Sequence, residues 1–369
     1  MFQIAVIFRV IFLSIIIFSV SSCGGGNTGG NSNNTDYASG ALDITIDFTG
    51  KNVYVLNAQS ENISHYTIMN DGSLKLNNAN SYVPTGWLPK SIIAHPTKNY
   101  VYVVNSYDHN ISQYTIGPNG ELTPNLTAAT VAAGMYPSSI AIDPSGSFAY
   151  VINGAVGETD ILQYTIQSDG TLLINNTAPF VEAKGASDIK FTPSGKYVYT
   201  NNYAWARISQ FTVETDGTLL ANTNAATVSV NSPISLVIHP SGKYAYAASI
   251  PSGSNNIMQY AIETDGTLIP NPIAASITAD KQVSYIAIHP SGNYVYTANG
   301  SSNTVSQYSV ENDGTLTAHT QAVTIPAGNG PNSIAIDPTG KYVYVPINNQ
   351  NGSGVSQYVV QLDGSLTPL

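Results

Sequence analysis

Residues 285–318 read YIAIHPSGNYVYTANGSSNTVSQYSVENDGTLTA, and residues 91–124 read SIIAHPTKNYVYVVNSYDHNISQYTIGPNGELTP. In both, a small apolar segment and a Pro-containing turn precede two segments rich in β-branched and aromatic residues, and then an Asp-Gly or Asn-Gly pair. Such segments favour strands, and these pairs tolerate the positive φ of tight hairpin turns. The unit predicts four short antiparallel strands, with the fourth running from Leu122 to Ala133.

The unit recurs seven times from residue 43 onward. The turn residue before the aromatic strand is found at Gly50, Lys98, Gly146, Gly195, Gly242, Gly292 and Gly340. Successive differences are 48, 48, 49, 47, 50 and 48 residues, a period in the range of four-stranded propeller blades. Because radial closure hides the edges of such sheets, we expect an all-β, seven-bladed β-propeller of four-stranded antiparallel blades. Residues Thr35 to Gly40 are expected to complete the outer edge of the last blade.

Two tyrosine columns and the Asp-Gly turns repeat in every unit. A tyrosine follows each turn residue by four positions, at Tyr54, Tyr102, Tyr150, Tyr199, Tyr246, Tyr296 and Tyr344. A second aromatic column is usually preceded by Gln, as at Gln113-Tyr114. Residues that occupy one strand position in every blade are expected to pack between blades and not to form a ligand-stacking ladder.

The N-terminal segment predicts export. Val10 to Val20 is an apolar run of 11 residues, too short for the roughly 20 residues that span a bilayer. It precedes Ser21-Ser22-Cys23-Gly24, which resembles the bacterial lipobox. We expect residues 1–22 to be a lipoprotein signal peptide, 23–35 a Gly/Asn/Ser-rich tether that starts at lipidated Cys23, and 36–369 a single propeller. The protein is then expected in the cell envelope, anchored to the outer membrane or cell surface by lipid alone.

The composition limits the partners. Charged residues make up only 9% of the chain, and the net charge is −10. Such a field repels nucleic acid, so no nucleic-acid partner is expected. No cofactor signature or metal site is recognised, and a monomer is expected.

The repeated unit carries a family resemblance. The pattern SIAIxPxGxYVYxxNxxxxxISQYxIxxDGxLT resembles the seven-bladed lactonase-type propellers, including the 6-phosphogluconolactonase family, and the related YVTN surface repeats. Residues 296–299, YTAN, are close to the motif that names those repeats. The resemblance covers residues 43–369 and implies a propeller. As an activity it implies the hydrolytic opening of a lactone.

Loop lengths place the expected site on one face. The Pro-Ser-Gly and Asp-Gly turns share one face (the bottom), whereas the more variable second-to-third and fourth-to-first connections share the other (the top). Variable loops on a rigid scaffold usually carry binding residues, so the site is expected at the top mouth of the central channel. His95, His239 and His289 precede the bottom-turn proline and are expected to stabilise turns and not to bind metal.

Blade four breaks the repeat most visibly. Asp188 replaces the usual Ser, and Lys190 replaces Ala in the innermost strand, where a lysine must be paired, with Asp188 or Glu182. One interpretation is a structural ion pair. The other is an anion-recognising patch in which Lys190 and Arg207 hold a carboxylate or phosphate. The candidate ligand-binding residues around it are Trp87, Lys90, Lys184, Trp205 and Lys281.

Two functions remain open at the sequence level. A lactonase needs a general base and an oxyanion donor; the candidate bases are His109, Asp108, Glu158, Asp160 and Glu182, with Lys190 or Arg207 as electrostatic stabiliser. The chain contains no GxSxG or HExxH motif. We therefore favour a non-catalytic envelope module that binds a small molecule, protein or glycan at its top face, with lactone hydrolysis as the alternative and a structural surface protein as a third possibility.

Overall fold

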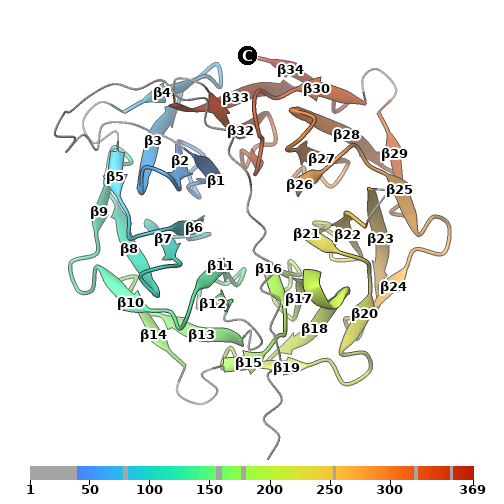
Figure 1. Cartoon of the computed structure of the whole chain (residues 1–369), viewed down its shortest axis with the longest axis horizontal. Coiled ribbons are helices and arrows are strands. Elements are labelled where there is room, and N and C mark those ends of the chain that lie inside the picture. The colour runs from blue at the N-terminus through green and yellow to red at the C-terminus, as the bar shows by residue number, and fades with distance from the viewer. Residues whose placement is uncertain are drawn as a thin grey trace, which may run out of the picture. The chain divides into compact units, whose positions relative to one another are not determined.

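The computed structural model describes residues 40–77, 82–154, 160–175, 180–251, 255–319, 323–349 and 352–369. These residues form seven antiparallel sheets that surround a central channel (Figure 1). The predicted seven-bladed β-propeller is thus confirmed. The predicted signal peptide, Cys23 and the tether lie outside the described residues. No helix in the described ranges is both long and apolar enough to cross a membrane.

Each blade runs outward from the channel. The innermost strands are β1 (Ala41–Ile46), β6 (Pro89–Ala94), β11 (Pro137–Ile142), β16 (Ala186–Phe191), β21 (Pro233–Ile238), β26 (Val283–Ile288) and β31 (Ala335–Ile336). The second strands are β2 (Asn52–Asn57), β7 (Tyr100–Asn105), β12 (Phe148–Asn153), β17 (Tyr197–Asn202), β22 (Tyr244–Ser249), β27 (Tyr294–Asn299) and β32 (Tyr342–Asn349). The third strands are β3 (Asn62–Ile68), β8 (Asn110–Ile116), β13 (Asp160–Ile166), β18 (Arg207–Val213), β23 (Asn256–Ile262), β28 (Thr304–Val310) and β33 (Gly352–Val360).

The outer edge of each blade is made of short pieces. The pieces that follow the Asp-Gly turn are β4 (Leu74–Leu76), β9 (Leu122–Pro124), β14 (Leu172–Ile174), β19 (Leu219–Ala221), β24 (Leu268–Pro270), β29 (Leu316–Ala318) and β34 (Leu366–Pro368). The pieces nearer the top are β5 (Tyr82–Pro84), β10 (Thr130–Ala132), β15 (Phe180–Glu182), β20 (Thr227–Ser229), β25 (Ser276–Thr278) and β30 (Thr324–Pro326). A 3-10 turn, η1 (Tyr203–Trp205), precedes β18.

The fourth strand is therefore divided, where the sequence predicted one continuous strand. In blade two, β9 and β10 both pair with β8, at opposite ends of it. Between them, the side-chain oxygen of Asn125 accepts the N–H groups of Thr127 and Ala128, which bends the chain away from the sheet. In blade seven only β34 is found among the described residues. The prediction that Thr35 to Gly40 completes this edge stays a prediction, because residues 35–39 lie outside the described ranges.

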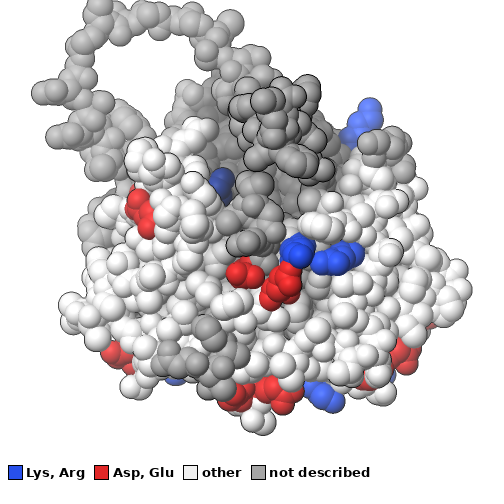
Figure 2. All heavy atoms as spheres, turned by 60° about the horizontal axis from the view of Figure 1, so that its bottom comes forward, with Lys and Arg blue, Asp and Glu red and all other residues white. Residues whose placement is uncertain are grey.

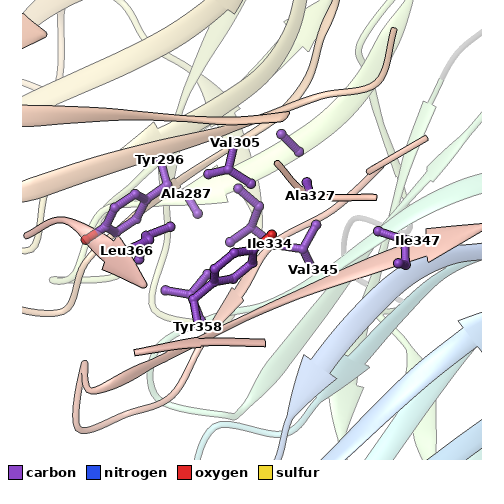
Figure 3. Packing of buried hydrophobic residues seen from close by; sticks show 11 residues of the cluster. Ala287, Tyr296, Val305, Ala327, Ile334, Val345, Ile347, Tyr358 and Leu366 are labelled. Atoms are coloured by element: carbon purple, nitrogen blue, oxygen red, sulfur yellow. The ribbon is translucent and has the colours of Figure 1, made fainter. Parts of the chain in front are cut away.

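The hydrophobic core consists of seven clusters, and each lies between two neighbouring blades. Figure 3 shows the cluster between blades six and seven, where Tyr296 and Val305 of one blade face Val345 and Tyr358 of the other. The second strands are buried along almost their whole length. Burial on both faces explains why they read as continuous apolar runs without polar alternation.

The tyrosine column that follows the turn residue joins each blade to the next. Every one of these hydroxyls donates a hydrogen bond of 2.7–2.8 Å to the glycine carbonyl of the next blade's Asp-Gly or Asn-Gly turn. The glycine is required, since at Gly314 φ is +79° and a Cβ would lie 2.3 Å from the ring of Tyr244. The expectation that this column packs between blades is confirmed.

The glutamine column makes a second joint. In six blades the Gln side-chain oxygen accepts the N–H of a leucine in the next blade, at 2.5–2.7 Å. The joint between blades seven and one has both contacts, from Tyr344 to Gly72 and from Leu74 to Gln357. The ring therefore closes through the same contacts that join its other blades.

The closing joint can be tested with a matched pair of variants. Tyr344→Phe removes the hydroxyl at the closure, and Tyr246→Phe removes its equivalent, which bonds Gly314 inside the ring. Each leaves a buried carbonyl unsatisfied, so both should lower the stability by about 1–3 kcal/mol. Thermal and denaturant unfolding measure this. If Tyr246→Phe lowered the free energy of unfolding and Tyr344→Phe did not, the result would contradict closure of the ring between blades seven and one.

The histidines before the bottom-turn prolines stabilise turns, as predicted. His95 Nδ1 accepts the N–H groups of Thr97 and Lys98, at 3.1 and 3.0 Å, and its Nε2 donates to the carbonyl of Gly146 in the next blade at 2.9 Å. His239 Nδ1 accepts the N–H of Ser241 at 3.0 Å, and its Nε2 donates to the carbonyl of Gly292 in the next blade at 3.1 Å. Burial lowers the pKa of both His95 and His239 below 6.5. If Nδ1 of His95 became protonated, its N–H would point at the two backbone N–H groups that the neutral nitrogen accepts, and both hydrogen bonds would be lost.

This arrangement predicts a loss of stability in mild acid. A histidine with a lowered folded-state pKa stabilises the fold fully above its unfolded pKa of about 6.5, and the contribution falls as the pH drops through the folded pKa. His95→Asp introduces the residue found at the same turn position in blade three, Asp143. When the pH is lowered from about 7.5 to 5, the Tm of the variant should fall by less than the Tm of the wild type. An unchanged pH dependence of Tm, followed by circular dichroism, would show that His95 does not carry this effect.

Candidate functional site

The innermost strands surround a cavity of about 320 Å³ in the central channel. It is lined by residues at the start of these strands, next to the fourth-to-first connections, so it lies toward the top face. The position agrees with the mouth expected from loop variability. The lining residues come from all seven blades.

One register position supplies a ring of polar side chains to this cavity. Counting seven residues back from each bottom-turn residue gives Asp43, Ser91, Ser139, Asp188, Ser235, Tyr285 and Ser333, and all seven line the cavity. The residue after each is apolar and belongs to the cores between blades, because side chains alternate along a strand. Sequence reasoning singled out Asp188 but missed Asp43 and Tyr285. An alignment of this one column would have found them.

Asp43 is fully engaged in holding the ring together. Its Oδ1 accepts bonds of 2.9 Å from the N–H of Ile44 and the hydroxyl of Ser333. Its Oδ2 accepts the N–H of Ile92 at 3.0 Å and the hydroxyl of Ser91 at 3.2 Å. Burial raises the pKa of Asp43, and the hydrogen bonds oppose this shift. The residue links blades seven, one and two and has little capacity left for a ligand.

Asp188 has the same position in blade four but a different environment. Its Oδ1 accepts the ammonium of Lys190 at 2.9 Å and the N–H of Ile189 at 2.9 Å. This confirms Asp188 as the partner of Lys190. Its Oδ2 is buried and has no hydrogen-bond partner among the described residues.

The free oxygen has a structural cause. The backbone N–H that would match the Ile92 contact of Asp43 belongs to Leu236 in blade five. With its amide oxygen turned toward blade five, Asn201 accepts this N–H and that of Ser235, both at 3.1 Å. Because Asn201 satisfies the next blade, the second oxygen of Asp188 is left with unused acceptor capacity, on a carboxylate that is 14% exposed at the cavity.

Lys190 remains charged beside this carboxylate. Burial alone would favour the neutral amine, but the charges of Asp188 and Asp43 and the neighbouring Tyr285 outweigh it and raise the pKa of Lys190 above its ordinary value. The ammonium lies 5.6 Å from the ring centroid of Tyr285. The lysine side chain is 29% exposed. The site therefore presents an ammonium and a partly free carboxylate oxygen side by side.

The other predicted site residues divide into two groups. Lys90 lines the cavity, at the start of β6. Glu182 and Lys184 instead form an exposed ion pair with each other, at 2.7 Å. Trp205 lies against Arg207, whose guanidinium carbon is 5.6 Å from the indole ring, and neither lines the cavity. The structure thus brings Lys190 together with Lys90 and Asp188, but not with Arg207 or Glu182.

Three further predicted residues lie in the top connections, outside the cavity lining. Trp87 packs on Tyr107, with ring centroids 4.4 Å apart. His109 Nδ1 accepts the N–H of Tyr136 at 3.0 Å. Lys281 lies in the connection before β26, where its carbonyl accepts the hydroxyl of Ser302. No cluster of three metal-ligating residues occurs among the residues that the structure describes.

The remaining candidate bases do not reach the cavity lining either. Asp108 accepts the backbone N–H of Trp87 in the top connections. Asp160 begins β13, where it is paired in register with Glu182 of β15 at the outer edge of blade three. Glu158 lies outside the described residues. Of the carboxylates considered as bases or ion-pair partners in the sequence, Asp188 is therefore the one that the structure brings to the cavity.

The family follows from the sequence of the blades. The family described as "Lactonase, 7-bladed beta-propeller" matches residues 89–271 and 236–369. The chain belongs to this lactonase family. No curated protein matches the chain. The expected resemblance to lactonase-type propellers is confirmed.

Solved structures share the fold of this lactonase-family chain. A putative 6-phosphogluconolactonase from Bacteroides uniformis is 22% identical, with a TM-score of 0.69 over 88% of this chain and 94% of that one. The periplasmic gluconolactonase PpgL of Pseudomonas aeruginosa is 19% identical, with a TM-score of 0.65 over 83% and 91%. Kuenenia stuttgartiensis hydrazine synthase is 17% identical, with a TM-score of 0.65 over 89% and 98%. At these identities the likeness shows the fold alone.

The surface is mostly uncharged. Figure 2 shows small groups of acidic and basic side chains on an otherwise white face, as expected for a chain with 9% charged residues. Charge is therefore concentrated at few positions.

The ion pair in the cavity predicts strong coupling between two substitutions. Asp188→Ser and Lys190→Ala each restore the residue that blade three carries at that position, Ser139 and Ala141. Either change alone leaves one charge without its partner, so each single variant should be less stable than the double variant. The coupling should be about 0.5–3 kcal/mol in a double-mutant cycle. Additive effects on the free energy of unfolding would show that the pair is not coupled.

Proposed function

We propose that this protein hydrolyses lactones of unphosphorylated sugars at the mouth of its central channel. The observation that carries the proposal is the free Oδ2 of Asp188, held beside the Lys190 ammonium in a cavity lined by serine hydroxyls. Membership of the lactonase family and the likeness to the periplasmic gluconolactonase support it. Lactone hydrolysis, the alternative at the sequence level, thus becomes the preferred function.

The geometry suits base-assisted attack by water. The Asp188 carboxylate, whose side chain is 14% exposed to the cavity, takes a proton from water as the water oxygen bonds to the lactone carbonyl carbon. The Lys190 ammonium donates hydrogen bonds to the oxyanion that develops on the carbonyl oxygen. When the tetrahedral intermediate collapses, the ring C–O bond breaks, and the departing oxygen recovers a proton from Asp188. The product is the open-chain hydroxy acid, and the carboxylate is regenerated.

The lining favours a polyhydroxylated, uncharged substrate. Four serines of the ring offer hydroxyls at one level of the channel: Ser91, Ser139, Ser235 and Ser333. The cavity is lined by two acidic residues, Asp43 and Asp188, and two lysines, Lys90 and Lys190, so its formal charges balance. Phosphate recognition generally uses a surplus of Arg or Lys. Arg207, the only arginine among the described residues, lies outside the lining.

Hydrolysis of glucono-δ-lactone tests the proposal. Asp188→Asn keeps the shape of the side chain but removes the base, so kcat should fall by about 10²–10⁴-fold. Lys184→Ala, which changes a cation outside the cavity, should retain the wild-type rate. The rate is followed by proton release in weak buffer, above spontaneous hydrolysis. A wild-type protein that does not accelerate the reaction would overturn the proposal and favour binding without catalysis.

A further inference from the structure

A group of exposed aromatic and apolar side chains lies on the top face over blades two and three. Trp87 and Tyr107 are 55% and 54% exposed, and Met135 and Tyr136 are 58% and 45% exposed. Leu88, beside Trp87, is 40% exposed. We call these five residues the aromatic rim. Exposed apolar groups that lie together commonly mark a binding site.

The rim is held rigidly by the second-to-third loop of blade two. Asp108 Oδ2 accepts the N–H of Trp87 at 2.8 Å, and His109 Nδ1 accepts the N–H of Tyr136 at 3.0 Å. One loop thus fixes the connections on both of its sides. Rings whose backbone is fixed in this way lose little entropy when they bind a ligand.

The rim uses a backbone position that every blade holds at positive φ, just before the innermost strand. Leu88 and Tyr136 have φ of +54° and +52°, and the equivalent Ser232 and Gln282 have +46° and +49°. Blades one, four and seven have glycine there, which adopts this conformation freely. What distinguishes blades two and three is that they place large apolar side chains at this position and leave them exposed.

The rim adjoins the cavity on the side of blades two and three. Trp87 precedes the cavity-lining Lys90 by three residues, a separation of at most about 11 Å along the chain. The equivalent residue pairs in blades five and six are polar: Asn231-Ser232 and Lys281-Gln282. A ligand in the cavity that is longer than one sugar ring would reach the paired aromatic rings of the rim in the direction of blades two and three. On the side of blade four, Trp205 lies against Gly185 and against Arg207.

We propose that the substrate is the lactone end of an oligosaccharide, and that the next sugar stacks on the Trp87–Tyr107 pair. This inference rests on the proposed function. Aromatic faces bind the C–H face of a pyranose and leave its hydroxyls in water, which fits rings that are half exposed. A stable protein interface needs about 20–30 residues a side, far more than the five of this rim. The hydroxyl-lined cavity beside the rim also favours a sugar over a peptide.

Kinetics with two lactones test the inference. The wild type should show a KM for cellobiono-δ-lactone about tenfold below that for glucono-δ-lactone, as expected for one added stacking contact. Trp87→Ala should remove this difference by raising the KM for the disaccharide lactone. The kcat and KM for glucono-δ-lactone, which is too short to reach the rim, should stay unchanged. Trp87→Phe should restore part of the difference. Phe48→Ala, which removes an exposed aromatic ring from a bottom turn, is the control and should leave both substrates unaffected.

A binding measurement separates failure of the rim from failure of the proposed function. Calorimetric titration of the Asp188→Asn variant with cellotetraose should show binding that is lost when Trp87→Ala is added. If the two lactones had equal kcat and KM, and Trp87→Ala had no effect, the inference that the rim binds a second sugar would be wrong. The lactonase proposal would still stand. If neither lactone is hydrolysed, the lactonase proposal fails, and the titration alone decides whether the rim binds a glycan.

Discussion

The hydrogen bond between a buried tyrosine hydroxyl and the glycine carbonyl of the next blade is the contact on which the architecture depends. It occurs at all seven joints, including the closure from Tyr344 to Gly72. The acceptor is presented by a turn that requires glycine, because its φ is positive and an aromatic ring leaves no room for a Cβ. Seven similar joints, each flanked by an apolar cluster, hold the sheets around one channel.

The joints and the cores between blades leave one position of the innermost strand free to vary, the channel column that runs from Asp43 to Ser333. Residues such as Ile189 and Leu236 are buried in the cores between blades and do not line the cavity, whereas Asp43 and Asp188 of the preceding column do. The apolar packing between blades therefore does not depend on the channel column. The two aspartates show how widely such positions can diverge. One accepts four hydrogen bonds, three of them from the neighbouring blades, and the other has an oxygen without a hydrogen-bond partner among the described residues, on a carboxylate paired with an ammonium.

The sequence correctly predicted one ion pair in the channel, at a position where the residue departed from the repeat. Lys190 was recognised because a lysine in an innermost strand must be paired, and Asp188 is its partner. Arg207 and Trp205 also departed from the repeat, but Arg207 begins the third strand β18, Trp205 ends the turn η1 before it, and the two contact each other outside the cavity lining. Sequence position within a blade does not reveal which top loops reach the cavity. The prediction of a lipid anchor at Cys23 concerns residues outside those described and stays a prediction.

The sequence by itself determined the blade number, the antiparallel hairpins and the bottom face, because these follow from local turn chemistry and a repeat of constant length. Only the tertiary structure decided which of the seven aligned positions become neighbours across the channel. Asp43, Asp188 and Tyr285 are far apart in the chain and meet because the ring closes. The free oxygen of Asp188 likewise depends on Asn201 of the same blade bonding to blade five. Contacts of this kind depend on the rotation of one sheet against the next, which no local pattern encodes.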